Sequence, residues 1–192
     1  MADKRSKALH YTIHVERALQ RFRELIVYVS QKSANDSHFG ATKLNKILYH
    51  SDFRAFERFG VPLTGMPYFK LQAGPAPKNL IPVRRDLISE GALEIQKVQI
   101  GPYEQDRTVA KRDPVLDHFT GDEIHLVDEV IAELWNQTAG EVSDASHDIR
   151  WRVLNLRDLL PYEFAFLSNE GVTQREIERT GELAERFGWA RS

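Results

Sequence analysis

Residues 43–75, KLNKILYHSDFRAFERFGVPLTGMPYFKLQAGP, decide the fold of this chain. We expect a helix over residues 41–59 whose apolar side chains form two neighbouring stripes: Leu44, Ile47, Leu48, Ala55 and Phe59 in one, and Tyr49, Phe53 and Phe56 in the other. An apolar arc of this width indicates a helix that packs on more than one side. Gly60 then provides a left-handed stop at the C-terminal end.

The stretch after this helix is rich in turn formers. Residues 61–79 hold four prolines and two glycines, a composition that disfavours long regular structure. We expect Tyr68, Phe69 and Leu71 to pin this proline-rich loop onto the core. A further helix over residues 79–89 should follow, with Pro82 in its first turn, where a missing N–H costs no helical hydrogen bond.

The flanking segments predict more helices and one hairpin. An amphipathic stripe over residues 16–32 indicates a helix. Residues 92–112 alternate with period two, which predicts a β-hairpin, and a bulge near Gln96 and Lys97 would reconcile its two out-of-phase apolar pairs. A capping box at Thr120 and Glu123 opens a helix to about residue 137.

The C-terminal part continues the helical pattern. A short helix is expected over residues 140–151, and a second capping box, Thr173 and Glu176, should open a last helix to about residue 187. The fold class predicted is therefore α+β, a predominantly helical single domain with a small antiparallel β-hairpin.

Composition limits the classes of function. The 192 residues are 42% hydrophobic and carry a net charge of -2, so no global attraction draws the chain to nucleic acid or to an anionic membrane. The chain has no cysteine, which rules out disulfides, thiolate metal sites and cysteine nucleophiles. No apolar run approaches the ~18 residues of a membrane span, and no signal peptide is visible. We expect a cytoplasmic protein without a membrane partner.

Three patterns suggest chemistry, but each lacks an essential part. His10 and His14 could share a helical face near Glu16, yet no third ligand or His-Glu-x-x-His pattern completes a metal site. The Gly-Pro-Ala-Pro run at 74–77 lacks the Gly-Lys-Ser/Thr sequel of a phosphate loop. Ser146, His147 and Asp148 are triad residue types, but adjacency in sequence does not make them converge in space. We therefore expect no enzyme, no cofactor and no metal.

Nucleic-acid binding remains the rival hypothesis. Helices followed by a hairpin are typical of winged-helix regulators, and the hairpin carries Arg107, Lys111 and Arg112. The helix at 41–59 is too apolar to read a groove, and the helix at 79–89 offers only Arg84 and Arg85. Nucleic acid is thus the less favoured partner.

Four motifs in order resemble a known family. Lys43-Leu44-x-Lys46-Ile47-Leu48-Tyr49, the Gly-Val-Pro-Leu turn at 60–63, the Gly74-Pro75 corner, and Ser146-His147 followed by Trp151 resemble the Panacea, or SocA-like, antitoxin domain. The resemblance spans roughly residues 20 to 165. Ala73 and Ala76, on either side of the corner, depart from the family pattern.

The resemblance implies an antitoxin that neutralises a cognate toxin by direct protein–protein contact, often on prophages or other mobile elements. One branch of the family delivers its toxin to a bacterial AAA+ protease, so a protease-adaptor role stays open, as does the oligomeric state. The implied Panacea-like domain is residues 16–167, between a flexible N-terminal segment (1–15) and a C-terminal helix (168–192) that could be partner-specific.

The resemblance also singles out site residues. The family-motif positions, structural or interfacial in role, are Lys43, Lys46, Tyr49, Gly74, Pro75, Ser146, His147 and Trp151. Large aromatic residues and arginines supply the strongest contacts in many protein interfaces. The candidates for partner binding are therefore Arg54 and Arg58 on the outer face of the central helix, and Tyr68 and Phe69 in the proline-rich loop. Trp151 is a further candidate.

Overall fold

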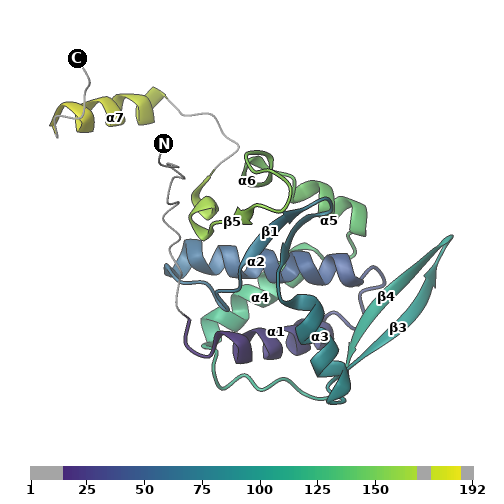
Figure 1. Ribbon diagram of the computed structural model, residues 1–192. Coiled ribbons are helices and arrows are strands. Elements are labelled where there is room, and N and C mark those ends of the chain that lie inside the picture. The colour runs from purple at the N-terminus through teal and green to yellow at the C-terminus, as the bar shows by residue number, and fades with distance from the viewer. Residues whose placement is uncertain (1–14, 168–173, 187–192) are drawn as a thin grey trace, which may run out of the picture.

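The computed structural model describes residues 15–167 and 174–186 (Figure 1). Its elements, in chain order, are α1 (Ala18–Lys32), α2 (Ala41–Phe59), β1 (Tyr68–Leu71), β2 (Gly74–Pro77), α3 (Leu80–Ser89), β3 (Leu93–Ile100), β4 (Tyr103–Ala110), α4 (Gly121–Glu133), α5 (Ala139–Ala145), α6 (Ile149–Arg152), β5 (Leu159–Leu160), the 3-10 helix η1 (Tyr162–Phe166) and α7 (Gln174–Arg186). The chain is α+β with a mainly helical character, as predicted.

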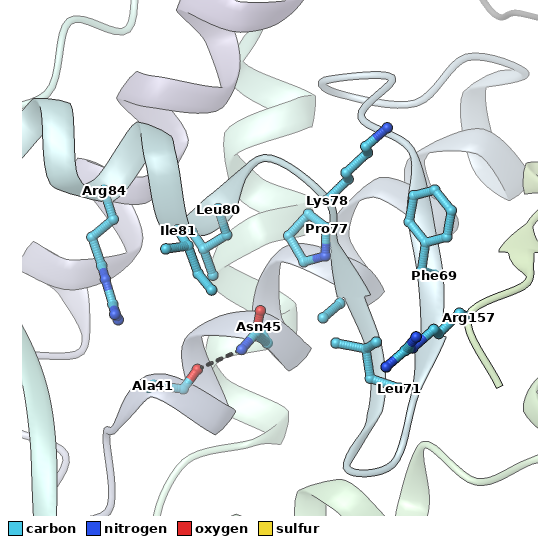
Figure 2. Close-up of a pocket in the computed structure, with 11 residues that line it drawn as sticks. Ala41, Asn45, Phe69, Leu71, Pro77, Lys78, Leu80, Ile81, Arg84 and Arg157 are labelled. Atoms are coloured by element: carbon cyan, nitrogen blue, oxygen red, sulfur yellow. Dashed lines mark hydrogen bonds between the residues drawn. The ribbon is translucent and has the colours of Figure 1, made fainter.

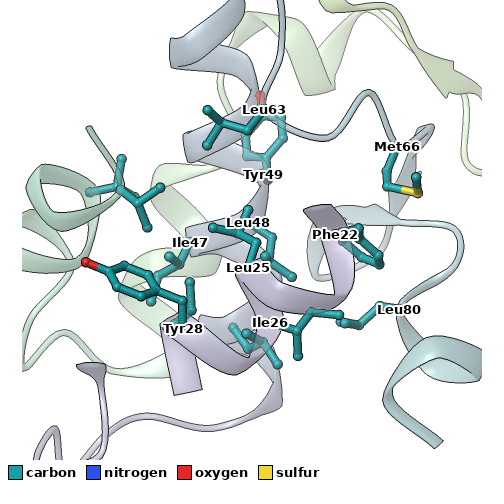
Figure 3. Packing of buried hydrophobic residues seen from close by; sticks show 14 of the residues in the cluster. Phe22, Leu25, Ile26, Tyr28, Ile47, Leu48, Tyr49, Leu63, Met66 and Leu80 are labelled. Carbon is teal, nitrogen blue, oxygen red and sulfur yellow. The ribbon is translucent and has the colours of Figure 1, made fainter. Parts of the chain in front are cut away.

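Helix α2 lies at the centre of the molecule. It contacts α1, α4 and α5 and also the strand β2 and the helix η1 (Figure 1). The wide apolar arc read from the sequence is explained by these neighbours, because Leu44, Leu48 and Tyr49 are all fully buried. Figure 3 shows Leu48 and Ile47 of α2 packed beside Leu25 of α1. The prediction of a central helix packed on several sides is confirmed.

The proline-rich stretch contains regular structure that the sequence did not predict. Strands β1 and β2 pair antiparallel from Tyr68 with Pro77 to Leu71 with Gly74. On its other side β1 pairs with the two-residue strand β5, so the sheet order is β2-β1-β5. The expectation of a loop is wrong here, because prolines are compatible with an edge strand, and β2 is an edge strand.

The β-hairpin is confirmed, but its predicted bulge is wrong. Strands β3 and β4 pair without interruption from Leu93 with Ala110 to Ile100 with Tyr103. The turn is correspondingly short, with Gly101 at a positive φ of 56°. Only the base of the ribbon reaches the core, so nothing forces the apolar side chains of its outer half onto a single face.

The helices of the second half differ from prediction at their ends. The first capping box is present, with Thr120 and Glu123 each accepting a hydrogen bond from the other's backbone N–H, and α4 ends at Glu133 instead of residue 137. The single helix expected over 140–151 is two helices, because the chain breaks at residues 146–148. Asp148 caps the second one by accepting from the N–H groups of Arg150 and Trp151.

Several predictions fall on residues outside the described ranges. They include the flexible segment at 1–15 for all but its last residue, the histidines at positions 10 and 14, and the start of the second capping box at Thr173. Helix α7 lies where the last helix was expected. In the part of the chain that the structure describes, no helix is long and apolar enough to cross a membrane.

The turn after α2 is fixed by a buried carboxylate. Asp52 is fully buried and accepts hydrogen bonds from the Thr64 N–H (2.7 Å), the Thr64 hydroxyl and the Tyr68 hydroxyl (2.7 Å). Burial raises the pKa of Asp52, although these three donors act in the opposite direction. The carboxylate thus ties the Gly-Val-Pro-Leu turn and the first residue of β1 to α2.

Replacing Thr64 by valine should destabilise the fold. Thr64→Val keeps the shape of the side chain but leaves Asp52 with one hydrogen-bond donor fewer in a buried site, which typically costs about 1–3 kcal/mol. The free energy of unfolding from urea titration measures this loss. Thr108→Val is the matched control, because the Thr108 hydroxyl is buried without a hydrogen-bond partner among the described residues. An equal loss in both variants would contradict the role of Asp52.

Candidate functional site

The Gly74-Pro75 corner closes over a buried lysine. Lys46, in the middle of α2, is 1% exposed, and its Nζ donates a hydrogen bond to the Pro75 carbonyl oxygen (3.1 Å). Gly74 has a φ of +88°, and a Cβ built on it would overlap the Lys46 Nζ and the Ser146 Oγ. Glycine is therefore required twice, by its backbone conformation and by the space that its neighbours occupy.

Helices α5 and α6 hold this corner from the other side. The Ser143 hydroxyl donates to the Ala73 carbonyl (3.1 Å), and the Ser146 hydroxyl donates to the Ser143 carbonyl (2.7 Å). The Trp151 indole N–H donates to the Leu71 carbonyl (3.0 Å). The turn between β1 and β2 is thus bound to the segment that carries the second family motif.

The Trp151 side chain makes two further contacts, with His147 and with Lys70. The His147 ring stacks on the indole at 4.1 Å between centroids, and the Lys70 amine lies 3.8 Å from the centre of the indole ring. Lys70 also donates to the Leu154 carbonyl (2.7 Å). These contacts explain why a tryptophan follows the Ser-His pair, since its ring contacts both His147 and Lys70 and its N–H has an acceptor.

The first lysine of the motif forms a buried ion pair. Lys43 and Asp36 are 1% and 2% exposed, and 2.7 Å separates the Lys43 Nζ from the Asp36 Oδ2. The other oxygen of Asp36 accepts the N–H of His38 (2.9 Å). The pair fixes the loop before α2 to the first turn of the helix, and breaking one partner of such a pair is strongly destabilising.

A groove opens on the outer face of the β1–β2 hairpin. Figure 2 shows the hairpin on one side, with Phe69 and Leu71, and α3 on the other, with Leu80 and Ile81. Ala41 and Asn45 of α2 lie between these two walls. The cavity has a volume of about 540 Å³, and we call it the hairpin groove.

The family follows from a comparison with family models. The model of the antitoxin SocA-like Panacea domain matches residues 44–152, which is more than half of the chain. This chain belongs to the Panacea-domain family. No curated protein and no solved structure matches it. The family implies a toxin–antitoxin role of a regulatory, non-catalytic kind, with a toxin as the general class of partner.

The Ser-His-Asp run of this Panacea domain is not arranged as a catalytic triad. The Ser146 hydroxyl donates to a backbone carbonyl, the His147 ring stacks on Trp151, and Asp148 caps α6. A triad would require the serine hydroxyl to donate to the imidazole and the imidazole to donate to the carboxylate. The three residues instead make three separate structural contacts.

The predicted partner-binding residues separate into three groups. Tyr68 is 0% exposed and donates to Asp52 and to the Leu48 carbonyl, so its prediction as an exposed contact is wrong. Arg54 and Arg58 lie on α2 but pair with Glu133 and Glu129 of α4. Phe69 is half-buried and lines the hairpin groove. Of the four, Phe69 alone combines exposure with a position beside a cavity.

The basic residues of the β3–β4 hairpin that were proposed for nucleic acid are bound to other groups of the same chain. Arg107 donates to the carbonyls of Asp36 and Ser37, Arg112 pairs with Glu24, and Lys111 lies 3.0 Å from Glu94. A phosphate-binding surface needs cations that are free to meet phosphates. Arg107 and Arg112 thus tie the β3–β4 hairpin to the loop before α2 and to α1, whereas Lys111 pairs with the neighbouring strand β3.

The family-motif residues are visible in the sequence, but the hairpin groove is not. Its apolar wall combines Ala76 and Pro77 from β2 with Ile81 from α3, and Arg157 comes from a segment about eighty residues further along. No local pattern joins such distant positions. One signal was available in the sequence, because Ile81 lies off the helical face shared by Leu80, Val83 and Leu87. In the structure Ile81 is 75% exposed.

The Gly74 requirement gives a sharp stability prediction. Gly74→Ala should destabilise the fold by about 2–4 kcal/mol, because the added methyl overpacks the corner and strains the backbone. Gly60→Ala is the matched control, since its φ is +76° and nothing lies within 4 Å of its Cβ position. The control should cost only about 1 kcal/mol in the free energy of unfolding. Equal losses would show that backbone strain alone matters.

The buried amine of Lys46 gives a pH prediction. Burial lowers the pKa of Lys46 to about 7, whereas the unfolded chain has the ordinary lysine value of 10.5. Between these values the unfolded state binds more protons, so the free energy of unfolding should rise with pH from about 7 to 10. From pH 7.5 to 9.5 the gain should be about 2–3 kcal/mol.

Lys46→Met separates this effect from other titrations. Methionine has a similar length and no charge, so the variant should lose that part of the pH-dependence while keeping the general shape of the curve. Urea unfolding of both proteins at the two pH values provides the comparison. A wild-type slope equal to that of the variant would show that the amine keeps an ordinary pKa.

Proposed function

We propose that this protein is an antitoxin that neutralises a cognate toxin by binding it directly and covering the region with which the toxin acts. The observation that carries the proposal is membership of the SocA-like antitoxin family over residues 44–152. An interface of ordinary size, about 1,200–2,000 Å² in total, would suffice for specific and stable binding.

The contacts of the signature residues agree with a binding role. Inside the domain, Lys43 joins α2 to the loop that precedes it, and Lys46 with Gly74 joins α2 to the β1–β2 hairpin. Trp151 fastens the same hairpin from outside through the Leu71 carbonyl, and Ser146 donates to the carbonyl of Ser143, whose hydroxyl donates to the Ala73 carbonyl. A framework fixed in this way presents its outer surfaces with little loss of conformational entropy on binding, which favours affinity.

Nucleic-acid binding is the weaker alternative in this proposal. The cations of the β3–β4 hairpin on which this alternative depends are bound to carboxylates and backbone carbonyls of the same chain. Releasing these cations would leave acceptors such as Glu24 without their partners. Burial alone would raise the pKa of Glu24, but the hydrogen bond and charge of Arg112 lower it, so the carboxylate depends on this partner.

Co-expression tests the proposed function. The protein should restore growth to cells that express the product of the adjacent open reading frame, and the two proteins should co-purify. An unrelated soluble protein of similar size, expressed from the same vector, is the control. Absence of both rescue and a complex would contradict the antitoxin assignment.

The amount of toxin during rescue distinguishes two mechanisms. Binding by occlusion predicts that the toxin remains abundant and is recovered in a one-step complex with this protein. Delivery to a protease predicts that the toxin disappears and returns when AAA+ protease genes are deleted. Immunoblots of the toxin during rescue, with and without those genes, give the answer.

A further inference from the structure

The hairpin groove is apolar in its walls and exposed at its edges. Ile81 is 75% exposed and Leu71 is 43% exposed, although both are large aliphatic side chains. Figure 2 shows them on opposite sides of the cavity, on α3 and on β1. Exposed apolar residues that gather around one concave surface typically mark an interaction site, whereas isolated ones need no explanation.

The charge of the groove has a single sign. Lys78, Arg84 and Arg157 line it, and no carboxylate does so in the described part of the chain. No ion pair joins these three cations to another residue within 15–167 or 174–186, in contrast to Arg54, Arg58 and Arg112, which all have carboxylate partners. An occupant with carboxylates would therefore meet complementary charge.

The edge of the sheet does not suit a strand as occupant. In an antiparallel ladder, alternate residues direct their N–H and C=O groups away from the partner strand. Pro75 and Pro77, which pair with Lys70 and Tyr68, take these outward positions in the edge strand β2. Since proline has no N–H, this edge offers no donors to an added strand. The occupant must instead insert side chains into the groove.

We infer that the hairpin groove binds an amphipathic helix of the toxin whose apolar stripe is bordered by glutamate or aspartate. The apolar side chains of this helix lie between Phe69 and Leu71 on one wall and Ile81 on the other. Its carboxylates meet Arg84, Lys78 and Arg157. This inference rests on the proposed function for the identity of the partner, and it uses the helix-in-groove mode of recognition.

A synthetic probe tests the groove without the toxin. The probe is a fluorescent helical peptide with leucine at positions i, i+4 and i+7 and glutamate on both borders of the stripe. Its counterpart carries lysine in place of glutamate. Fluorescence anisotropy with the full chain should show binding of the glutamate peptide at least tenfold tighter than that of the lysine peptide, and the difference should shrink in high salt.

Substitutions on α3 locate the binding. Ile81→Glu and Arg84→Glu should each weaken binding of the glutamate peptide at least tenfold. Ile88→Glu and Arg85→Glu are matched controls, because both residues are exposed on the same helix and do not line the groove. Unchanged circular dichroism and thermal midpoints verify folding. Equal losses in variants and controls, or equal binding of both peptides, would overturn the inference.

The same variants separate this inference from the proposed function. If the wild-type chain and the controls rescue growth and the Ile81→Glu, Arg84→Glu double variant does not, both stand. If the double variant rescues as well, the groove assignment fails and the antitoxin assignment stands. If no form rescues but the glutamate peptide binds in the groove, the antitoxin assignment fails and the preference for an acidic helix stands.

The C-terminal part of the chain is a competing occupant. Residues 158–192 hold seven acidic and four basic residues, so this part also carries complementary charge. If it filled the groove, Leu183→Glu in α7 should tighten binding of the glutamate peptide several-fold by releasing the site. That result would assign the groove to this chain itself, whereas unchanged affinity supports a toxin helix.

Discussion

The buried amine of Lys46 lies against Gly74 and Pro75 at the start of β2, and the position of the β1–β2 hairpin depends on this contact. An amine in an apolar interior favours its neutral form, and here the Pro75 carbonyl is its hydrogen-bond acceptor. A side chain at position 74 would push the lysine and Ser146 apart. Lys46 and Gly74 therefore constrain each other, because the long side chain of Lys46 fills the space that any side chain at position 74 would need.

Two more buried polar sites, one ion pair and one carboxylate, extend this constraint along α2. Asp36 with Lys43 fixes the chain that enters the helix, and Asp52 fixes the turn that leaves it. Such groups are expensive to bury, so they add specificity more than stability. Each one has partners from a different loop, and a register shift of any loop would leave a charge unpaired. The helix thus dictates one arrangement of the segments around it.

Much of this could be predicted from the sequence, and the rest could not for identifiable reasons. The width of the apolar arc on α2 and the capping box at Thr120 are local patterns, and they predicted the central helix and the start of α4. Tyr68 was expected both to pin the proline-rich loop onto the core and, as a large aromatic residue, to contact the partner. Its hydroxyl instead completes the buried Asp52 site, with a partner sixteen positions away, which leaves only the first role. The sheet was missed because Pro75 and Pro77 argue against a strand unless that strand is known to be an edge.

The prolines of β2 connect the interior of the domain to its outer surface. The Pro75 carbonyl, which points away from β1, accepts the hydrogen bond of Lys46, so the strand is held at a fixed distance from α2. At this same edge the prolines offer no N–H to an added strand, while Ala76 and Pro77 line the hairpin groove. A rigid strand that cannot aggregate through its edge is suited to present an apolar surface, since it excludes unspecific pairing while leaving side-chain contacts available. The two departures from the family pattern, Ala73 and Ala76, flank this corner, and Ala76 lines the groove with only a methyl group.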